Sequence, residues 1–89
     1  MTRDSLANRF LNMVINEEII FECNECKFAV KLTECFGVRL LILTGNGFFA
    51  SPYVSQFTNP HCMVGHIELI LSKGWNNLED VKEIEVKFS

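Results

Sequence analysis

Two stretches of the chain carry apolar residues at helical spacing. The first has an apolar stripe at positions i, i+4, i+7 and i+8, formed by Leu6, Phe10, Met13 and Val14. Asp4 or Ser5 suits the cap in front of this stripe, so the pattern predicts a helix from there to about Ile15. This helix would pack one face against the rest of the protein.

The second stretch is more apolar and has clearer ends. Asn59 suits a helix cap and Pro60 suits the first helical position, while Gly74 is a stop signal after Lys73. We therefore expect a helix over about Pro60–Lys73. Its inward-facing residues would be Met63, Ile67, Ile70 and Leu71.

Between the helices the apolar pattern changes to that of strands. Ile19–Phe21 and Phe28–Leu32 are typical of two strands, with a tight turn at Asn24-Glu25. A second pair is predicted at Val38–Leu43 and Phe48–Ala50. These two would be joined through Gly45-Asn46-Gly47, because Asn-Gly is the strongest short hairpin signal.

The strand predicted at Val38–Leu43 is apolar on both faces, so it should be covered on both sides or lie in a dimer interface. Ser51–Thr58 is expected to be a connection, and Leu78–Val81 a short helical turn. Ile84–Phe88 alternates cleanly, which predicts an edge strand with one buried face. Together these elements predict a single α+β domain over residues 1–89: an N-terminal helix, an antiparallel sheet of three or four strands, a second helix packed on it and a short C-terminal strand.

Charge and composition narrow the class of function. The net charge is −3 and the pI about 5.3, which argues against direct nucleic-acid binding. The acidic residues form two clusters, and Arg39 is the sole charged side chain between Cys35 and Ile67. The clusters are Glu17, Glu18, Glu22 and Glu25, and then Glu79, Asp80, Glu83 and Glu85. Acidic ends around an uncharged middle suit a partner with a basic surface, although solvated loops and helix ends would give the same pattern.

The start of the chain lacks the pattern of a secretory signal, and no apolar run reaches the roughly 18 residues of a membrane span. We therefore expect a cytoplasmic protein with no membrane association. Cysteines in such a protein are more often reduced core residues or metal ligands than disulfides. One alternative is a zinc site with three thiolates and one imidazole, from Cys23, Cys26, Cys62 and His66. The favoured interpretation is reduced cysteines and no cofactor.

Signals of catalysis are weak. Cys62 lies near both His61 and His66, but no segment resembles an oxyanion-stabilising loop. The segment Gly45-Asn46-Gly47 is too short to cradle a phosphate and is not followed by a helix. We therefore expect a non-enzymatic protein. Trp75 has two interpretations, as a core anchor at the end of the second helix or as an interface anchor within a polar rim.

Four segments, in this order and spacing, resemble the small phage anti-CRISPR inhibitors of the type II-A class. They are Ala29–Leu32, Leu40–Leu43, Gly45-Asn46-Gly47 and Lys73-Gly74-Trp75-Asn76, within a similarity of about 60 residues. The resemblance implies a helix followed by an antiparallel sheet and further helical structure. It also implies an inhibitor whose acidic and polar side chains fill the DNA-binding groove of a CRISPR nuclease.

Carried over to this chain, the resemblance assigns partner contact to the turn and to the segment around the tryptophan. The residues concerned are Asn46, Trp75, Asn76, Asn77, Glu79 and Asp80. The sequence therefore predicts an inhibitor acting in the host cytoplasm on a defence protein, with a CRISPR effector nuclease as the specific candidate. The alternatives are a small zinc-stabilised regulatory domain and a self-associating structural module, with a homodimer formed through the two-faced sheet.

Overall fold

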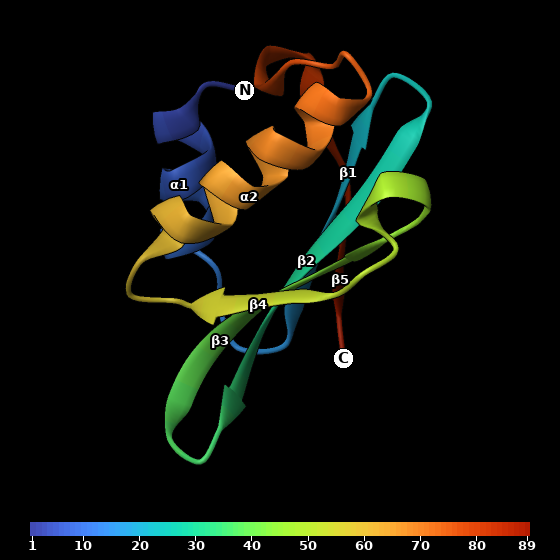
Figure 1. Cartoon of the computed structure of the whole chain (residues 1–89). Coiled ribbons are helices and arrows are strands. Elements are labelled where there is room, and N and C mark those ends of the chain that lie inside the picture. The colour runs from blue at the N-terminus through green and yellow to red at the C-terminus, as the bar shows by residue number, and fades with distance from the viewer.

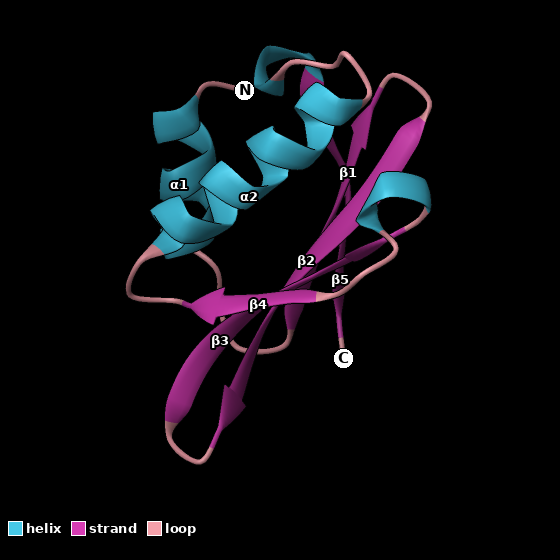
Figure 2. Cartoon of the chain, viewed as in Figure 1, coloured by secondary structure: helices cyan, strands magenta, loops and turns pink.

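The computed structural model describes residues 1–89 and has the α+β architecture that the sequence predicts (Figures 1 and 2). Two helices, five strands and two short 3₁₀ helices follow one another along the chain. In order they are α1 (Arg3–Leu11), β1 (Glu17–Cys23), β2 (Cys26–Cys35), β3 (Val38–Gly45), η1 (Gly47–Phe49), β4 (Tyr53–Gln56), α2 (Pro60–Lys73), η2 (Leu78–Asp80) and β5 (Val81–Phe88).

The strands form one antiparallel sheet in the order β4-β3-β2-β1-β5. Both helices lie on the same face of this sheet, and the opposite face has no covering layer (Figure 1). Burial alternates along the central strands for this reason. In β1 every second residue from Glu17 to Cys23 is buried, and the residues between are half-buried. β3 is therefore covered on one face only within a single chain, and its pairing with another copy remains a prediction.

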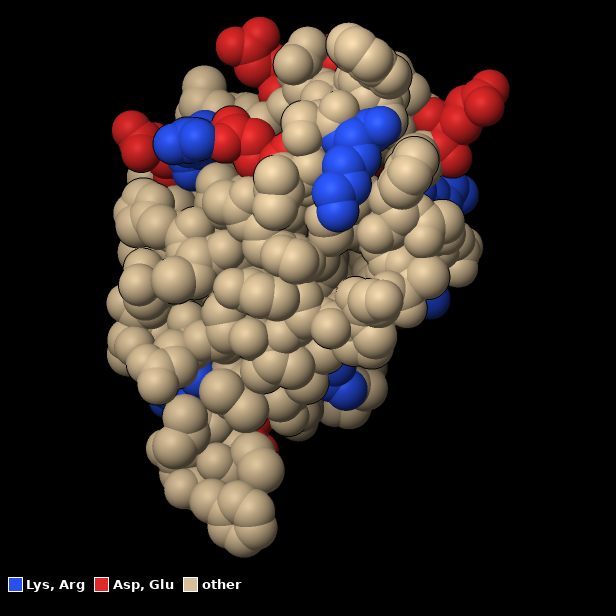
Figure 3. Space-filling model, viewed as in Figure 1, with Lys and Arg blue, Asp and Glu red and all other residues tan.

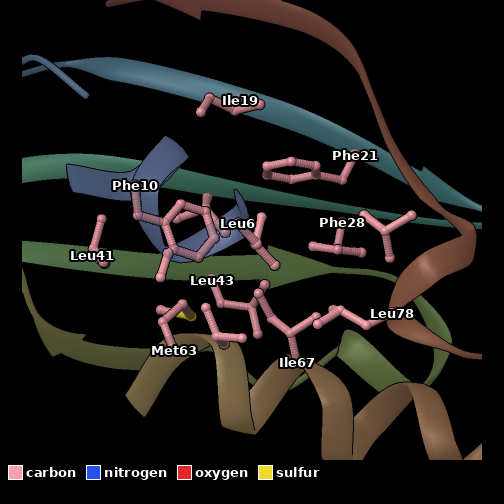
Figure 4. Packing of buried hydrophobic residues seen from close by; sticks show 14 of the residues in the cluster. Leu6, Phe10, Ile19, Phe21, Phe28, Leu41, Leu43, Met63, Ile67 and Leu78 are labelled. Atoms are coloured by element: carbon pink, nitrogen blue, oxygen red, sulfur yellow. The ribbon is translucent and has the colours of Figure 1, made fainter. Parts of the chain in front are cut away.

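The core fills the space between the helices and the sheet and contains 20 buried residues (Figure 4). Phenylalanine rings run across it from strand to strand. Phe21 stacks on Phe28 with ring centroids 5.2 Å apart, and Phe28 stacks on Phe49 at 4.6 Å. Phe10 of α1 meets Phe21 edge to face at 6.1 Å. These stacks tie α1, β1, β2 and η1 into one packed unit.

The helix predictions differ in accuracy. α2 spans Pro60–Lys73 as predicted, and its four expected inward residues are buried. The side chain of Asn59 makes no capping hydrogen bond and instead donates to the sulfur of Cys62. α1 is shorter than predicted because it ends at Leu11, and its cap is Thr2, whose hydroxyl accepts from the Ser5 N–H at 3.1 Å.

The hairpin predicted at Asn46-Gly47 is wrong. Gly47–Phe49 form a 3₁₀ turn, and the strand that pairs with β3 is β4, within the segment predicted as a connection. The reason is packing: Phe49 is buried against Phe28, and the chain folds back over Gly45 so closely that a Cβ there would lie 2.7 Å from the Cβ of Phe49. Glycine at position 45 therefore permits a reversal that the local pattern does not reveal.

The C-terminal strand is at an edge of the sheet, as predicted, but its expected buried face is wrong. Val81 is its only buried residue, while Ile84, Val86 and Phe88 are 43%, 38% and 68% exposed. The helix layer does not extend over this part of the strand, so its apolar side chains meet no second layer.

Candidate binding site at the Trp75 end of the sheet

One end of the molecule carries the β1–β2 turn, η1 and the segment Gly74–Asp80, and we call it the Trp75 end. Here α2 terminates in a Schellman motif: the Trp75 N–H donates to the carbonyl of Ser72 at 3.1 Å, and the Asn76 N–H to that of Leu71 at 2.9 Å. This motif needs a left-handed residue, which is usually glycine. Gly74 is not that residue, since its φ is −101°; Trp75 takes the position with φ 61°.

The interpretation of Trp75 as a core anchor is wrong, because its side chain is 94% exposed. A left-handed backbone costs a non-glycine residue about 1–2 kcal/mol. The largest apolar side chain of the protein thus stands in water on a backbone that glycine would fit better. Neither property stabilises the isolated fold, which is the arrangement expected of an interface anchor.

The surroundings of Trp75 are fixed by contacts to two other segments. The side-chain amide of Asn24, in the β1–β2 turn, donates to the side-chain oxygen of Asn76. A Cβ on Gly74 would lie 3.4 Å from the ring of Phe48, which is itself 59% exposed. Trp75 is therefore followed by an anchored asparagine and preceded by a glycine beside a second exposed aromatic ring.

The remaining predicted contact residues are at the same end but do not form a single cluster. Asn46 is exposed and lines a shallow cavity of about 250 Å³ with Glu25 and Lys27. Asn77 accepts a weak hydrogen bond at its carbonyl from the buried thiol of Cys23, at 3.7 Å. Asn46 thus borders the β1–β2 turn, whereas Asn77 contacts the end of β1.

Glu79 and Asp80 are exposed residues of η2. The amino group of Met1 donates to the carbonyls of Leu78, Glu79 and Val81 at 3.1–3.2 Å, which ties this turn to the start of the chain. Glu79 also lines a surface cavity of about 380 Å³, and Asp4 and Glu68 add two further carboxylates to its rim. Arg3 and the amino-terminal Met1 line the same cavity, and Arg3 is ion-paired with Glu68, so Glu79 lies in a lining of mixed charge.

In the structure, each of the two acidic clusters of the sequence contains one carboxylate that is paired with Arg9. Arg9 of α1 donates to Glu17 at 2.8 Å and to Glu83 at 2.9 Å, so one carboxylate from each cluster is paired with a cation. Glu22 and Glu25, at the end of β1 and in its turn, lie at the same end as Glu79 and Asp80. In Figure 3 acidic side chains lie at the upper end, where α2 ends, with basic side chains between them, above a nearly uncharged middle. The Trp75 end thus carries four carboxylates together with three lysines, Lys27, Lys73 and Lys82, and Lys27 and Lys82 lie directly opposite Glu22 on the neighbouring strands.

The alternative zinc site is not assembled. Cys23 and Cys26 face each other across the β1–β2 turn, at the end of the fold where α2 terminates. Cys62 lies in the first turn of α2, a helix about 21 Å long, and is therefore far from them. No group of three or more potential ligands comes together anywhere in the protein. Burial, and next the carboxylate of Asp80, raise the pKa of the Cys23 thiol, which keeps it protonated and disfavours metal binding.

Cys62 and His66 do not form a nucleophile–base pair. The sulfur of Cys62 accepts from the Asn59 side chain at 3.2 Å, and the His66 ring stacks on Tyr53 with centroids 3.8 Å apart. Burial, with a smaller contribution from Lys73, lowers the pKa of His66. The histidine acts as a flat packing surface between α2 and β4.

Sequence reasoning missed one exposed aromatic at the other end of the sheet. Phe36 is fully exposed in the two-residue turn that joins β2 to β3, with φ 52°, and Gly37 follows with φ 81°. The X-Gly pair between two apolar runs was the available signal for this turn. Val38, Arg39 and Phe57 line a neighbouring open cavity of about 450 Å³, where Arg39 lies over the Phe57 ring at 6.0 Å.

Comparison with protein-family models, with curated proteins and with solved structures finds no match to this chain in any of the three. Neither helix has the length and apolar content needed to cross a membrane. The class defined by the fold is thus an α+β domain with two helices on one face of a five-stranded antiparallel sheet, and its function has to be argued from its surface.

Proposed function

We propose that this protein is a non-enzymatic inhibitor that binds a partner protein through the Trp75 end and occludes a basic surface on it. The observation that carries the proposal is the conformation of Trp75, a 94% exposed tryptophan in a left-handed position at the end of the fold that also carries Glu79 and Asp80. Tryptophan is among the residues most enriched in binding hot spots, and charge around such an anchor favours a partner of opposite sign.

The proposed target is a host defence protein, and the specific candidate is a CRISPR effector nuclease at its DNA-binding groove. The support for this target is the resemblance carried by Gly45–Gly47 and Lys73–Asn76, together with the acidity at the same end of the fold. A groove that binds DNA is lined with lysine and arginine. The carboxylates of Glu79 and Asp80 would take the place of phosphates there, while Trp75 supplies apolar contact.

The test is a binding measurement between the purified protein and a type II-A nuclease loaded with guide RNA, paired with an assay of target DNA cleavage. Stoichiometric inhibition and a measurable dissociation constant are expected. Trp75→Ala should weaken binding at least about tenfold, as expected for a buried aromatic hot spot. Reversing both charges, with Glu79→Lys and Asp80→Lys, should slow association and reduce its dependence on salt.

Matched controls lie at the opposite end of the sheet. Phe36→Ala removes an aromatic with the same exposure and backbone conformation, and Glu34→Lys reverses an exposed carboxylate. Both should leave affinity and association rate unchanged. Equal losses in the control and test variants would remove the assignment to the Trp75 end, and the absence of binding and inhibition would remove the nuclease as the target.

A further inference from the structure

The two edges of the sheet differ in length. β4 forms one edge with four residues, while β5 forms the other with eight and pairs only with β1. An edge strand leaves a row of backbone N–H and C=O groups unpaired, and a long one is a template for another strand. β5 is therefore the place where this sheet can be extended.

The side chains of β5 are sorted between its two faces. The pairing of Ile19 with Val86, and of Glu17 with Phe88, places Val86 and Phe88 on the face that carries the helices, and Ile84, the unpaired residue of a bulge, precedes them. All three are substantially exposed. The opposite face carries Glu85 and Lys87, whose charged atoms lie 3.7 Å apart. The second half of β5 thus has one apolar face and one face with both signs of charge.

This arrangement is self-complementary in one antiparallel register. When the two-fold axis passes through Val86, Glu85 of each strand faces Lys87 of the other, and Ile84 faces Phe88. An axis at Glu85 would oppose two glutamates, and an axis at Lys87 would oppose two lysines. An axis at Ile84 would place Glu83 opposite Glu85 twice. Like charges directly opposite are destabilising, so of these four registers only the one centred on Val86 avoids them.

We propose that a second copy of this chain binds along β5 in this register and joins two sheets into one continuous sheet. The pairing satisfies the outward backbone groups of both edges and forms two Glu85–Lys87 pairs between chains. It also brings together four apolar side chains, from Val86 and Phe88 of each copy. Ile84 is the extra residue of the bulge opposite Ile20 and Phe21, and the strand from Glu85 onward, which carries the charge pairs and the Val86 axis, is regular.

This inference is independent of the proposed inhibitor function. Val81, at the start of β5, pairs with Cys23 beside the Trp75 end, whereas Val86 and Phe88 lie farther along the strand, toward the start of β1. The dimer would leave both Trp75 ends free. It would therefore present two copies of the candidate binding site, which raises avidity toward a target with repeated sites.

The test is sedimentation equilibrium over a wide range of protein concentration. The wild type should show a monomer–dimer equilibrium. Glu85→Lys and Lys87→Glu should each weaken dimerisation at least about tenfold, because each turns two attractive pairs into repulsive ones. An equimolar mixture of these two variants should form heterodimers, and the chain with both substitutions should recover the wild-type dissociation constant.

The control variant is Val54→Lys, which places a charge on the exposed part of the uncovered sheet face and should leave the dimer intact. Circular dichroism should confirm that all variants are folded. A wild type that is monomeric at every concentration would overturn the proposal. So would a dimer that is insensitive to both charge reversals, or one that Val54→Lys abolishes.

Discussion

Trp75 and Phe36 adopt the same left-handed backbone conformation at opposite ends of the sheet. Their φ angles are 61° and 52°, and their side chains are 94% and 101% exposed. Each occupies a position where glycine would be free of strain, one closing α2 and one turning β2 into β3. The Trp75 end carries Glu22, Glu25, Glu79 and Asp80, whereas Glu34 is the carboxylate nearest in sequence to Phe36, so the two ends differ in their number of acidic groups although their aromatics are alike.

Replacing Trp75 with glycine should stabilise the fold while it weakens partner binding. Glycine relieves the left-handed strain at the end of α2, so the free energy of unfolding should rise by about 1 kcal/mol. Urea unfolding followed by circular dichroism measures this change. Phe36→Gly should give a gain of the same sign and leave binding unaltered. A loss of stability in Trp75→Gly would mean that the indole contributes to the fold and would weaken its role as a binding anchor.

Two glycines offer a sharp contrast in packing. A Cβ at Gly45 would lie 2.7 Å from the Cβ of Phe49 and 3.0 Å from the carbonyl oxygen of Lys27, whereas a Cβ at Gly65 would meet nothing within 4 Å. Gly45→Ala should therefore destabilise the protein by about 2 kcal/mol through overpacking. Gly65→Ala, within α2, should stabilise it by up to about 1 kcal/mol through helix propensity. Thermal unfolding of both variants measures the contrast, and equal effects would contradict the close approach of η1 to β3.

Lowering the pH should remove the stabilisation that the ionised carboxylate of Glu17 contributes to the fold. Burial by itself would raise the pKa of Glu17, but hydrogen bonds from Arg9 and from the Val14 N–H outweigh it, and the pKa is lowered. A lowered folded-state pKa means that the stabilisation is present above the unfolded value of 4.5 and is lost as the pH falls through the folded value.

Glu17→Gln should consequently lower stability at pH 7 by about 1 kcal/mol and flatten the decline below pH 4.5. Urea unfolding at pH 7 and pH 3 separates the two effects. Glu34→Gln is the control, because Glu34 is exposed and makes no ion pair. If both variants lose stability with acid as steeply as the wild type, the bridge from Arg9 to Glu17 is not the source of this dependence.

The elements that the sequence predicted well are those with local signals. α2 has a proline at its first position and a strong apolar stripe, and its bounds were predicted correctly. The Asn46-Gly47 hairpin failed because its outcome depends on Phe49 reaching Phe28, a contact that no local pattern encodes. The candidate site was found in part: Trp75 stood out by type, but its exposure depends on which residue takes the left-handed position, and Gly74 was the expected one.

The cysteines provide the last prediction, because their environments differ within one short chain. Cys23 is buried, and burial followed by the charge of Asp80 raises its pKa, whereas Cys35 and Cys62 are exposed. The thiolate is the reactive form, so iodoacetamide should modify Cys35 and Cys62 in the native protein and reach Cys23 only after unfolding. Mass spectrometry of peptides from timed reactions measures this order. Native labelling of Cys23 at the rate of Cys62 would contradict its burial.

A chelator should leave the unfolding midpoint unchanged, because Cys23, Cys26, Cys62 and His66 do not meet. A loss of stability caused by the chelator would restore the zinc-dependent alternative.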